Sequence, residues 1–191
     1  MDILDYLSLS EEVISASRRH GGIQRCDAAV DAISKSLNSD AVFLVCGNGG
    51  SASDAMHIAG ELVGRFLKER QALNCICLSS NPSILTAWSN DYSYDTVFSR
   101  QVEAYGKSGG TLLGLSTSGN SQNIINAFEA AKDIGMTTIG LTGEGGGKMR
   151  DHTDILIDVP SKSTPLIQQV HICLYHYICE NVERSILAKR Q

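Results

Sequence analysis

Residues 45–65 constrain the fold of this 191-residue chain more than any other stretch. The stretch begins at the end of an apolar run, has glycine at positions 47, 49 and 50, and continues with apolar residues at helical spacing. This order predicts a buried strand, a tight turn and a helix. Because glycines let backbone N–H groups approach an anion and a helix N-terminus is partly positive, the turn suits a phosphate or the polar end of a sugar.

The rest of the chain alternates between apolar runs of strand length and helical patterns. Strands are predicted at residues 41–46, 72–78, 111–115, 137–141 and 155–159. Helices are predicted at 3–19 and 23–37, after the glycine turn, at 83–88 and 96–105, from residue 121 to about 134, and at 165–187, with residues 90–93 in a loop. This alternation predicts an α/β fold, a doubly wound parallel five-stranded sheet flanked by helices, with N-terminal helices before it. In such sheets ligands bind beyond the carboxyl ends of the strands.

Composition excludes several classes of partner. Sixteen basic and 21 acidic residues give a net charge of -5, which argues against nucleic acid or an anionic membrane as the primary partner. No apolar run approaches the roughly 18 residues of a membrane helix. The six cysteines lie mostly in apolar runs and form no CxxC pair, as is typical of free thiols in a reducing compartment. We therefore expect a single soluble domain, 1–191, in the cytoplasm.

The glycine turn also fits a dinucleotide fingerprint, Gly47-x-Gly49-x-x-Ala52. However, the next predicted strand ends in Leu78-Ser79-Ser80-Asn81, which offers no acidic residue to the ribose hydroxyls. A Walker-type loop is excluded because no GxxxxGK[ST] pattern follows the strand. A dinucleotide is thus a poor candidate ligand.

A second polar turn, residues 116–121, follows the strand predicted at 111–115. Its four hydroxyl side chains can simply cap the next helix, but a cap needs only one or two of them. Hydroxyls and helix-end amides together also suit the oxygens of a phosphate group. The sequence leaves both functions open, with phosphate favoured.

Polar residues recur on two of the predicted helices. Asp54, His57, Glu61 and Arg65 form a stripe at spacings of three and four, which is either a solvated helix face or one side of a site. The last helix is apolar almost all round, yet carries Gln168, His171 and His176. Side chains of these types can ligate zinc, although a single buried His is more often an ordinary hydrogen-bonded core residue. Spacing alone does not pair the two helices.

Taken together, these motifs resemble those of the bacterial phosphoheptose isomerases, which are sugar isomerase (SIS) domain proteins. The resemblance spans essentially the whole chain and rests on residues 46–51, 54–57 with Glu61, 64–65, 90–91, 98–103, 116–121 and 167–168 with His171 and His176. It implies an SIS fold in which residues 1–38 form N-terminal helices used in oligomerisation. It also implies conversion of sedoheptulose 7-phosphate to D-glycero-D-manno-heptose 7-phosphate through an enediol or enediolate. That reaction is the first step of heptose nucleotide biosynthesis for lipopolysaccharide, capsule or a related glycoconjugate.

The resemblance further implies a homotetramer with active sites between subunits and the role of each site residue. Zn²⁺ would be held by His57, Glu61, Gln168 and His176, with Glu61 and His176 as the acid–base pair. The substrate-binding residues would be Asn48, Gly49, Gly50, Ser51, Glu61, Arg65, Asn90, Asp91, Ser116, Thr117, Ser118, Ser121 and Gln168. Within this set, residues 116–118 and Ser121 would hold the phosphate and residues 48–51 the sugar.

The chain departs from the family pattern around Gln168. It has Leu166 where the family usually has Arg, Gln169 where Glu is usual, and Pro165 where Asp or Ala is common. These departures leave open an isomerase of another ketose phosphate. A non-catalytic SIS-domain regulator that binds a protein partner is the second alternative, but such a relative does not need the carboxylate that this chain keeps at Glu61.

Overall fold

The computed structural model describes residues 1–189. The helices are α1 (Ile3–Ser17), α2 (Cys26–Asn38), α3 (Gly50–Val63), α4 (Pro82–Asp91), α5 (Val97–Tyr105), α6 (Gln122–Ile134) and α7 (Thr164–Ala188). The strands are β1 (Phe43–Gly47), β2 (Cys75–Cys77), β3 (Thr111–Ser116), β4 (Thr137–Thr142) and β5 (Ile155–Asp158). Short 3₁₀ helices lie at η1 (Ile23–Arg25), η2 (Tyr94–Thr96) and η3 (Gly147–His152).

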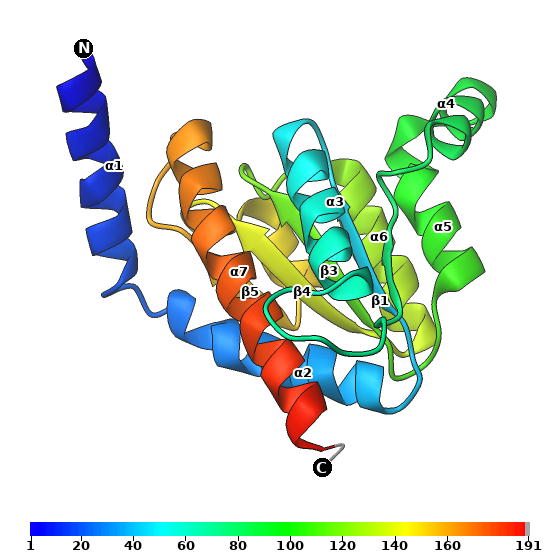
Figure 1. The fold of residues 1–191 in the computed structure, drawn as a ribbon. Helices are drawn as coiled ribbons and strands as arrows, with labels where there is room; N and C mark the ends of the chain where they lie inside the picture. The colour runs from blue at the N-terminus through cyan, green and yellow to red at the C-terminus, as the bar shows by residue number, and fades with distance from the viewer. Residues whose placement is uncertain (190–191) are drawn as a thin grey trace.

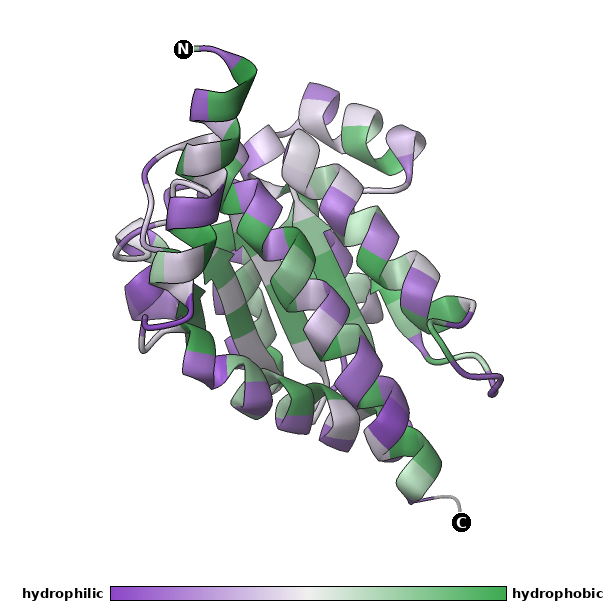
Figure 2. Cartoon of the chain, turned by 60° about the vertical axis from the view of Figure 1, so that its left-hand side comes forward, coloured by the Kyte–Doolittle hydropathy of each residue, from purple (hydrophilic) through white to green (hydrophobic). Residues whose placement is uncertain are grey.

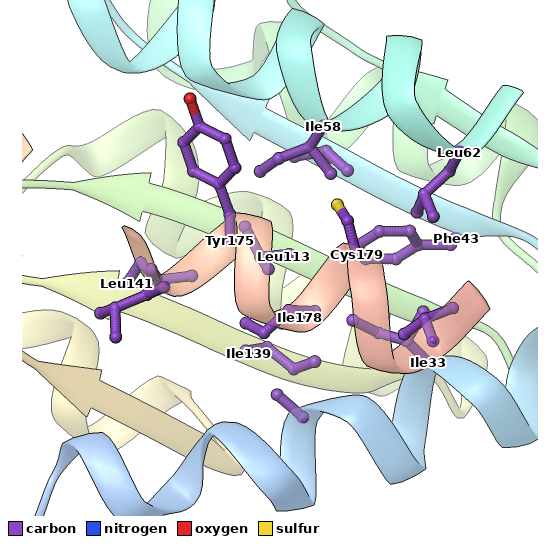
Figure 3. Packing of buried hydrophobic residues seen from close by; sticks show 14 of the residues in the cluster. Ile33, Phe43, Ile58, Leu62, Leu113, Ile139, Leu141, Tyr175, Ile178 and Cys179 are labelled. Atoms are coloured by element: carbon purple, nitrogen blue, oxygen red, sulfur yellow. The ribbon is translucent and has the colours of Figure 1, made fainter. Parts of the chain in front are cut away.

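The five strands form one parallel sheet in the order β2-β1-β3-β4-β5, with helices on both faces (Figure 1). The predicted α/β architecture is therefore confirmed. Alternate strand residues point to opposite faces, so each strand contributes to two cores. Phe43 and Val45 pack under α2, α3 and α7, whereas Leu44 and Cys46 pack under α5 and α6. Figure 3 shows the first core, where α3 and α7 lie over the sheet.

Two predicted boundaries are wrong. The strand predicted at 72–78 is only three residues long, because the chain turns just before it: the Cys75 N–H donates to the Leu73 carbonyl, and the Leu73 N–H donates to the Leu62 carbonyl at the end of α3. The loop predicted at 90–93 begins later, since α4 continues to Asp91. Asn81 caps the start of α4, where its side chain accepts hydrogen bonds from the backbone N–H groups of Ser83 and Ile84. Pro82 occupies the first turn.

The N-terminal helix α1 extends from the body of the molecule and contacts α7 (Figure 1). Its side chains Ile3, Leu4 and Leu7 remain exposed. Figure 2 shows hydrophobic segments recurring along this helix. No helix within residues 1–189 combines the length and apolar character needed to cross a membrane. The six cysteines are free, as predicted, and all but Cys173 are buried.

Candidate active site

The strand order places the two polar turns side by side. After β1 the chain crosses to β2 on one side and then to β3 on the other, so a crevice opens between the carboxyl ends of β1 and β3. A pocket of about 310 Å³ lies there. Its lining comes from both turns and from the start of α7: Asn48, Gly49, Gly50, Ser51, Leu115, Ser116, Thr117, Ser118, Ser121, Thr164 and Gln168.

Glycine is favoured at two positions of the first turn. Gly49 has φ +55°, a left-handed conformation that disfavours residues with a side chain. At Gly50 a Cβ atom would lie 2.6 Å from Nε2 of Gln168. The side chain of Gln168 therefore lies against the backbone of the glycine turn, and both line one pocket.

The hydroxyls of the second turn are directed at one another. Oγ of Ser116 lies 2.9 Å from Oγ of Ser121 and 3.4 Å from Oγ of Ser118. Ser121 occupies the N-cap position of α6, yet its side chain makes no capping hydrogen bond. Since these hydroxyls gather in the pocket rather than cap the helix, the arrangement favours anion binding over the capping alternative.

Asn48 is held by two residues that the sequence analysis did not identify. Its Oδ1 accepts hydrogen bonds from the Tyr94 hydroxyl at 2.7 Å and from Nδ2 of Asn123 at 3.0 Å. Its Nδ2 donates to Oδ1 of Asn123 at 2.9 Å. The carboxamide oxygen of Asn48 is thus used within the protein, and one amide N–H is left for a ligand.

The polar stripe of α3 meets the last helix at a cluster of His57, Glu61 and His176. Their ligand atoms all lie within 4.8 Å of one another, and Nε2 of His57 lies 2.9 Å from Oε1 of Glu61. The rings of His57 and His176 meet edge to face at 5.0 Å. The structure therefore pairs the two helices, which spacing alone could not do.

Tyr175 and Asp54 orient His57. The Tyr175 hydroxyl lies 2.9 Å from Nδ1 of His57 and hydrogen bonds to Asp54. Burial, together with the nearby Asp54, raises the pKa of the Tyr175 phenol, so the hydroxyl keeps its proton. Burial also raises the pKa of the Asp54 carboxyl, against the lowering effects of His57 and Tyr175. Asp54 is 9% exposed, so this member of the stripe does not lie on a solvated helix face.

Two tautomers of His57 fit these contacts. With its proton on Nε2, His57 donates to the Glu61 carboxylate. With its proton on Nδ1, it donates to the Tyr175 oxygen and leaves the Nε2 lone pair beside the Glu61 carboxylate, where a cation would lie between the two. With the nitrogen of His176, the cluster offers the N and O donors that zinc takes at a catalytic site with an open position. The residues present therefore fit a zinc ion.

Other predicted site residues lie away from this cluster. Gln168 precedes His176 by eight residues on α7, a rise of about 12 Å, and lies in the pocket. Arg65 follows the end of α3, and its side chain is 61% exposed. Its Nε lies 3.8 Å from Oε2 of Glu69. Asn90 donates to Asp91 at the end of α4. One protomer thus separates the predicted site into two halves, the pocket and the cluster.

Comparison with known proteins gives consistent matches. The model of the SIS domain family matches residues 6–143. The phosphoheptose isomerase of Crocosphaera subtropica is 55% identical over 146 residues, which are 76% of this chain and 74% of that protein. The phosphoheptose isomerase of Synechocystis sp. is 52% identical over 164 residues, 86% of this chain and 84% of that protein. The structure of the phosphoheptose isomerase from Neisseria gonorrhoeae matches with a TM-score of 0.89 at 37% identity and covers 95% of this chain and 97% of that chain.

Proposed function

Because the chain belongs to the SIS domain family and to its phosphoheptose isomerases, we propose that it converts sedoheptulose 7-phosphate to D-glycero-D-manno-heptose 7-phosphate. It is a phosphosugar isomerase of heptose biosynthesis. The observation that carries the proposal is that a chain about half identical to enzymes of that name has both the cluster of His57, Glu61 and His176 and a hydroxyl-lined pocket.

The reaction moves a proton between adjacent carbons and another between their oxygens. Glu61, as carboxylate, removes the proton from the carbon next to the ketone carbonyl. It then returns the proton to the carbon that was the ketone carbonyl. His176 gives a proton to the carbonyl oxygen and later takes one from the hydroxyl that becomes the aldehyde. A zinc ion bound by this cluster would supply positive charge that stabilises the enediolate and orients the sugar oxygens.

The pocket holds the end of the substrate that does not react. The hydroxyls of residues 116–118 and Ser121, with the N-terminus of α6, are suited to the phosphate oxygens. The glycine turn lets backbone groups approach the sugar chain. Binding energy from this end positions the carbons that react.

We place each complete active site between two copies of the chain in a homotetramer. Ten residues of α3 separate Ser51 in the pocket from Glu61, a rise of about 15 Å, which exceeds the length of an extended seven-carbon chain. His57 is 47% exposed at its side chain, so the cluster opens outward rather than into its own pocket. The pocket and Gln168 of one copy, facing the cluster of another, would bring the two halves together.

The activity is tested with purified protein, zinc and sedoheptulose 7-phosphate, with the aldose product followed by NMR. We expect product from the wild-type protein. For Glu61→Gln we expect a fall in kcat of about 10²- to 10⁴-fold at similar KM, because the general base is lost while the pocket remains. Absence of product from the wild-type protein, or unchanged turnover in Glu61→Gln, would contradict the proposal.

Mixed assemblies test the placement of the site between copies. Glu61→Gln and Gln168→Ala each impair every site of their own homotetramer, but a mixed tetramer contains some sites with both native residues. We expect co-expression of the two variants to restore activity. The matched control is Glu61→Gln with His176→Gln, which alter the same half and should restore nothing. Equal activity in the two mixtures would argue for a site within one chain.

Leu166 is the residue that favours the alternative substrate, another ketose phosphate. It is buried near the start of α7, two residues before Gln168, where relatives usually have a charged side chain. A panel of pentulose, hexulose and heptulose phosphates tests the fit, and we expect the highest kcat/KM for the heptulose. The free cysteines support a reducing compartment such as the cytoplasm.

A further inference from the structure

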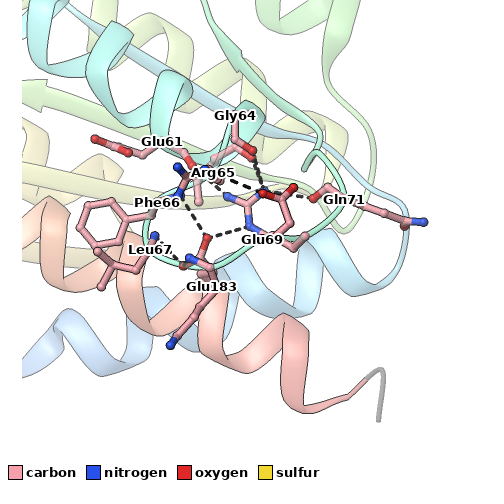
Figure 4. A network of polar contacts seen from close by, with 11 residues as sticks. Glu61, Gly64, Arg65, Phe66, Leu67, Glu69, Gln71 and Glu183 are labelled. Atoms are coloured by element: carbon pink, nitrogen blue, oxygen red, sulfur yellow. Dashed lines mark hydrogen bonds and ion pairs between the residues drawn. The ribbon is translucent and has the colours of Figure 1, made fainter.

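A buried ion pair joins α7 to the segment that follows α3. The side chains of Arg70 and Glu183 are 2% and 1% exposed, and Nε of Arg70 lies 3.0 Å from Oε1 of Glu183 (Figure 4). The Glu183 carboxylate also accepts three successive backbone N–H groups, from residues 66, 67 and 68, at 2.9 to 3.1 Å. Burial alone would raise the pKa of Glu183, but these donors and Arg70 lower it, so the carboxylate stays charged.

The other nitrogens of Arg70 hold the end of α3. Nη1 donates to the carbonyls of Leu62, Gly64 and Gln71, and Nη2 donates to the carbonyl of Glu61 at 2.8 Å. The last carbonyls of a helix have no partner within the helix and carry partial negative charge. Arg70 therefore satisfies the helix end that includes the backbone of Glu61, and Glu183 fixes that Arg to α7.

The same segment places an aromatic ring on His176. Phe66, whose N–H donates to Glu183, stacks on His176 with ring centroids 5.6 Å apart and planes inclined by 24°. His176 also meets His57 and Tyr175 edge to face. Three rings thus limit the orientations open to the His176 imidazole, and the Arg70–Glu183 pair holds one of them.

We propose that the Arg70–Glu183 pair and the 64–71 segment form a positioning element for the isomerase site, acting on His176 through the Phe66 ring. This proposal rests on the proposed function. Two apolar side chains in place of the pair would fill the same space with less desolvation cost, but they could not hold four carbonyls and three N–H groups at fixed positions. Arg70, Glu183 and Phe66 do not take part in the proton transfers; they fix the geometry of the groups that do.

The first test replaces the ring and leaves the ion pair intact. Phe66→Leu keeps apolar volume and the backbone N–H, so we expect folding close to that of the wild type. We expect zinc affinity, measured by competition with a chromophoric chelator, to fall about 10-fold, as when a group that orients a metal ligand is lost. We also expect kcat to fall to a similar extent, with KM nearly unchanged because the pocket is intact.

Two matched controls accompany this variant. Phe66→Tyr keeps an aromatic face on His176 and should keep zinc affinity and kcat near the wild-type values. Lys68→Ala alters an exposed side chain of the same segment while keeping the N–H that donates to Glu183, and it should behave in the same way. A Leu variant with wild-type zinc affinity and kcat would overturn the proposal.

The second test breaks the ion pair. Glu183→Gln should lower zinc affinity at least as much as Phe66→Leu does. The zinc affinity of the double variant should be no lower than that of Glu183→Gln alone, because both changes act through one ring. Losses that simply add would overturn the route through Phe66. If Glu183→Gln does not fold, the Phe66 variants decide the proposal.

Zinc affinity is measured without substrate, so these results stand even if the wild-type protein does not isomerise sedoheptulose 7-phosphate. That result would contradict the proposed function and leave the affinity comparison valid. A wild-type protein that fails to bind zinc would overturn the positioning role, because His176 would then have no metal ion to bind.

Discussion

Some residues near the pocket hold other site residues in place instead of contacting the substrate themselves. Asn48 lies in the glycine turn, but its oxygen is bound by Tyr94 and Asn123. Tyr94 belongs to η2, which follows α4, so its hydroxyl ties the connection between α4 and α5 to the turn. Its removal should loosen the turn without touching the acid–base pair.

Tyr94→Phe is expected to raise KM for sedoheptulose 7-phosphate by about 2- to 10-fold, the equivalent of one hydrogen bond, with kcat near the wild-type value. The measurement is steady-state kinetics on the zinc-loaded enzyme. Tyr92→Phe is the control, since that neighbouring hydroxyl makes no hydrogen bond within residues 1–189. An unchanged KM in Tyr94→Phe would show that the turn keeps its shape without this bond.

At the same scale, the sequence predicted some site residues and missed others. His57 and Glu61 were identified because a spacing of four places both on one helical face. Tyr175, Phe66 and Arg70 were missed because nothing in their local sequence distinguishes them from core or surface residues. Tyr175 and His57 are 118 residues apart, and only the packing of α3 on α7 brings them together.

At the scale of elements, α7 is joined to the sheet by a buried histidine. His171 is fully buried, and its Nε2 lies 3.1 Å from the carbonyl oxygen of Thr142 at the end of β4. Its Nδ1 has no hydrogen-bond partner within the described part of the chain. Burial lowers the pKa of His171 from 6.5 to about 4, although the Thr142 carbonyl partly offsets the shift.

This shift predicts an acid-sensitive fold. Between pH 6.5 and about 4 the unfolded chain binds a proton at residue 171 and the folded chain does not. The free energy of unfolding should therefore decrease as pH falls through this range, by up to about 3 kcal/mol from this one group.

His171→Gln keeps a donor for the Thr142 carbonyl and removes the titration, so its urea-unfolding free energy should fall less between pH 7 and 4 than that of the wild type. His152→Gln, at a half-buried histidine of η3 whose Nδ1 lies 3.2 Å from Oε1 of Glu129, is the control and should follow the wild-type curve. If His171→Gln and the wild type lose the same stability over this range, His171 is not the group responsible.

Element boundaries were predicted well where the chain itself sets them and poorly where a neighbour does. Asn81 and Pro82 fix the start of α4 from within its own sequence. The start of β2 instead follows a turn in which the Cys75 N–H donates to the Leu73 carbonyl and the Leu73 N–H donates to the Leu62 carbonyl of α3. An apolar pattern cannot show that a residue with strand character bonds to a helix end instead of a neighbouring strand.

At the scale of the whole molecule, α1 presents an apolar face that its own chain does not cover. Leu4 is 69% exposed and Leu7 is 56% exposed on a helix that extends from the body. An exposed apolar stripe of this kind is typical of an interface. We propose that it packs against another copy, in line with the expected role of residues 1–38 in oligomerisation.

Leu4→Glu with Leu7→Glu should shift the protein from tetramers toward smaller species at micromolar concentration, as measured by light scattering after size exclusion. Activity should fall with the tetramer fraction, because the proposed complete sites lie between copies. Glu12→Lys changes charge on another side of the same helix and serves as the control. A double variant that remains tetrameric and active would place the interface elsewhere.

The sequence by itself determined the order of strands and helices, the two polar turns and the residue types of the site, because each depends on neighbours within a few positions. Tertiary structure decided which turns share a pocket, that α3 faces α7, and that Glu183 holds Arg70 across 113 residues. These contacts depend on packing between distant segments, which periodicity does not encode. Packing also separated the pocket from the cluster within one chain, which supports the proposed site between copies.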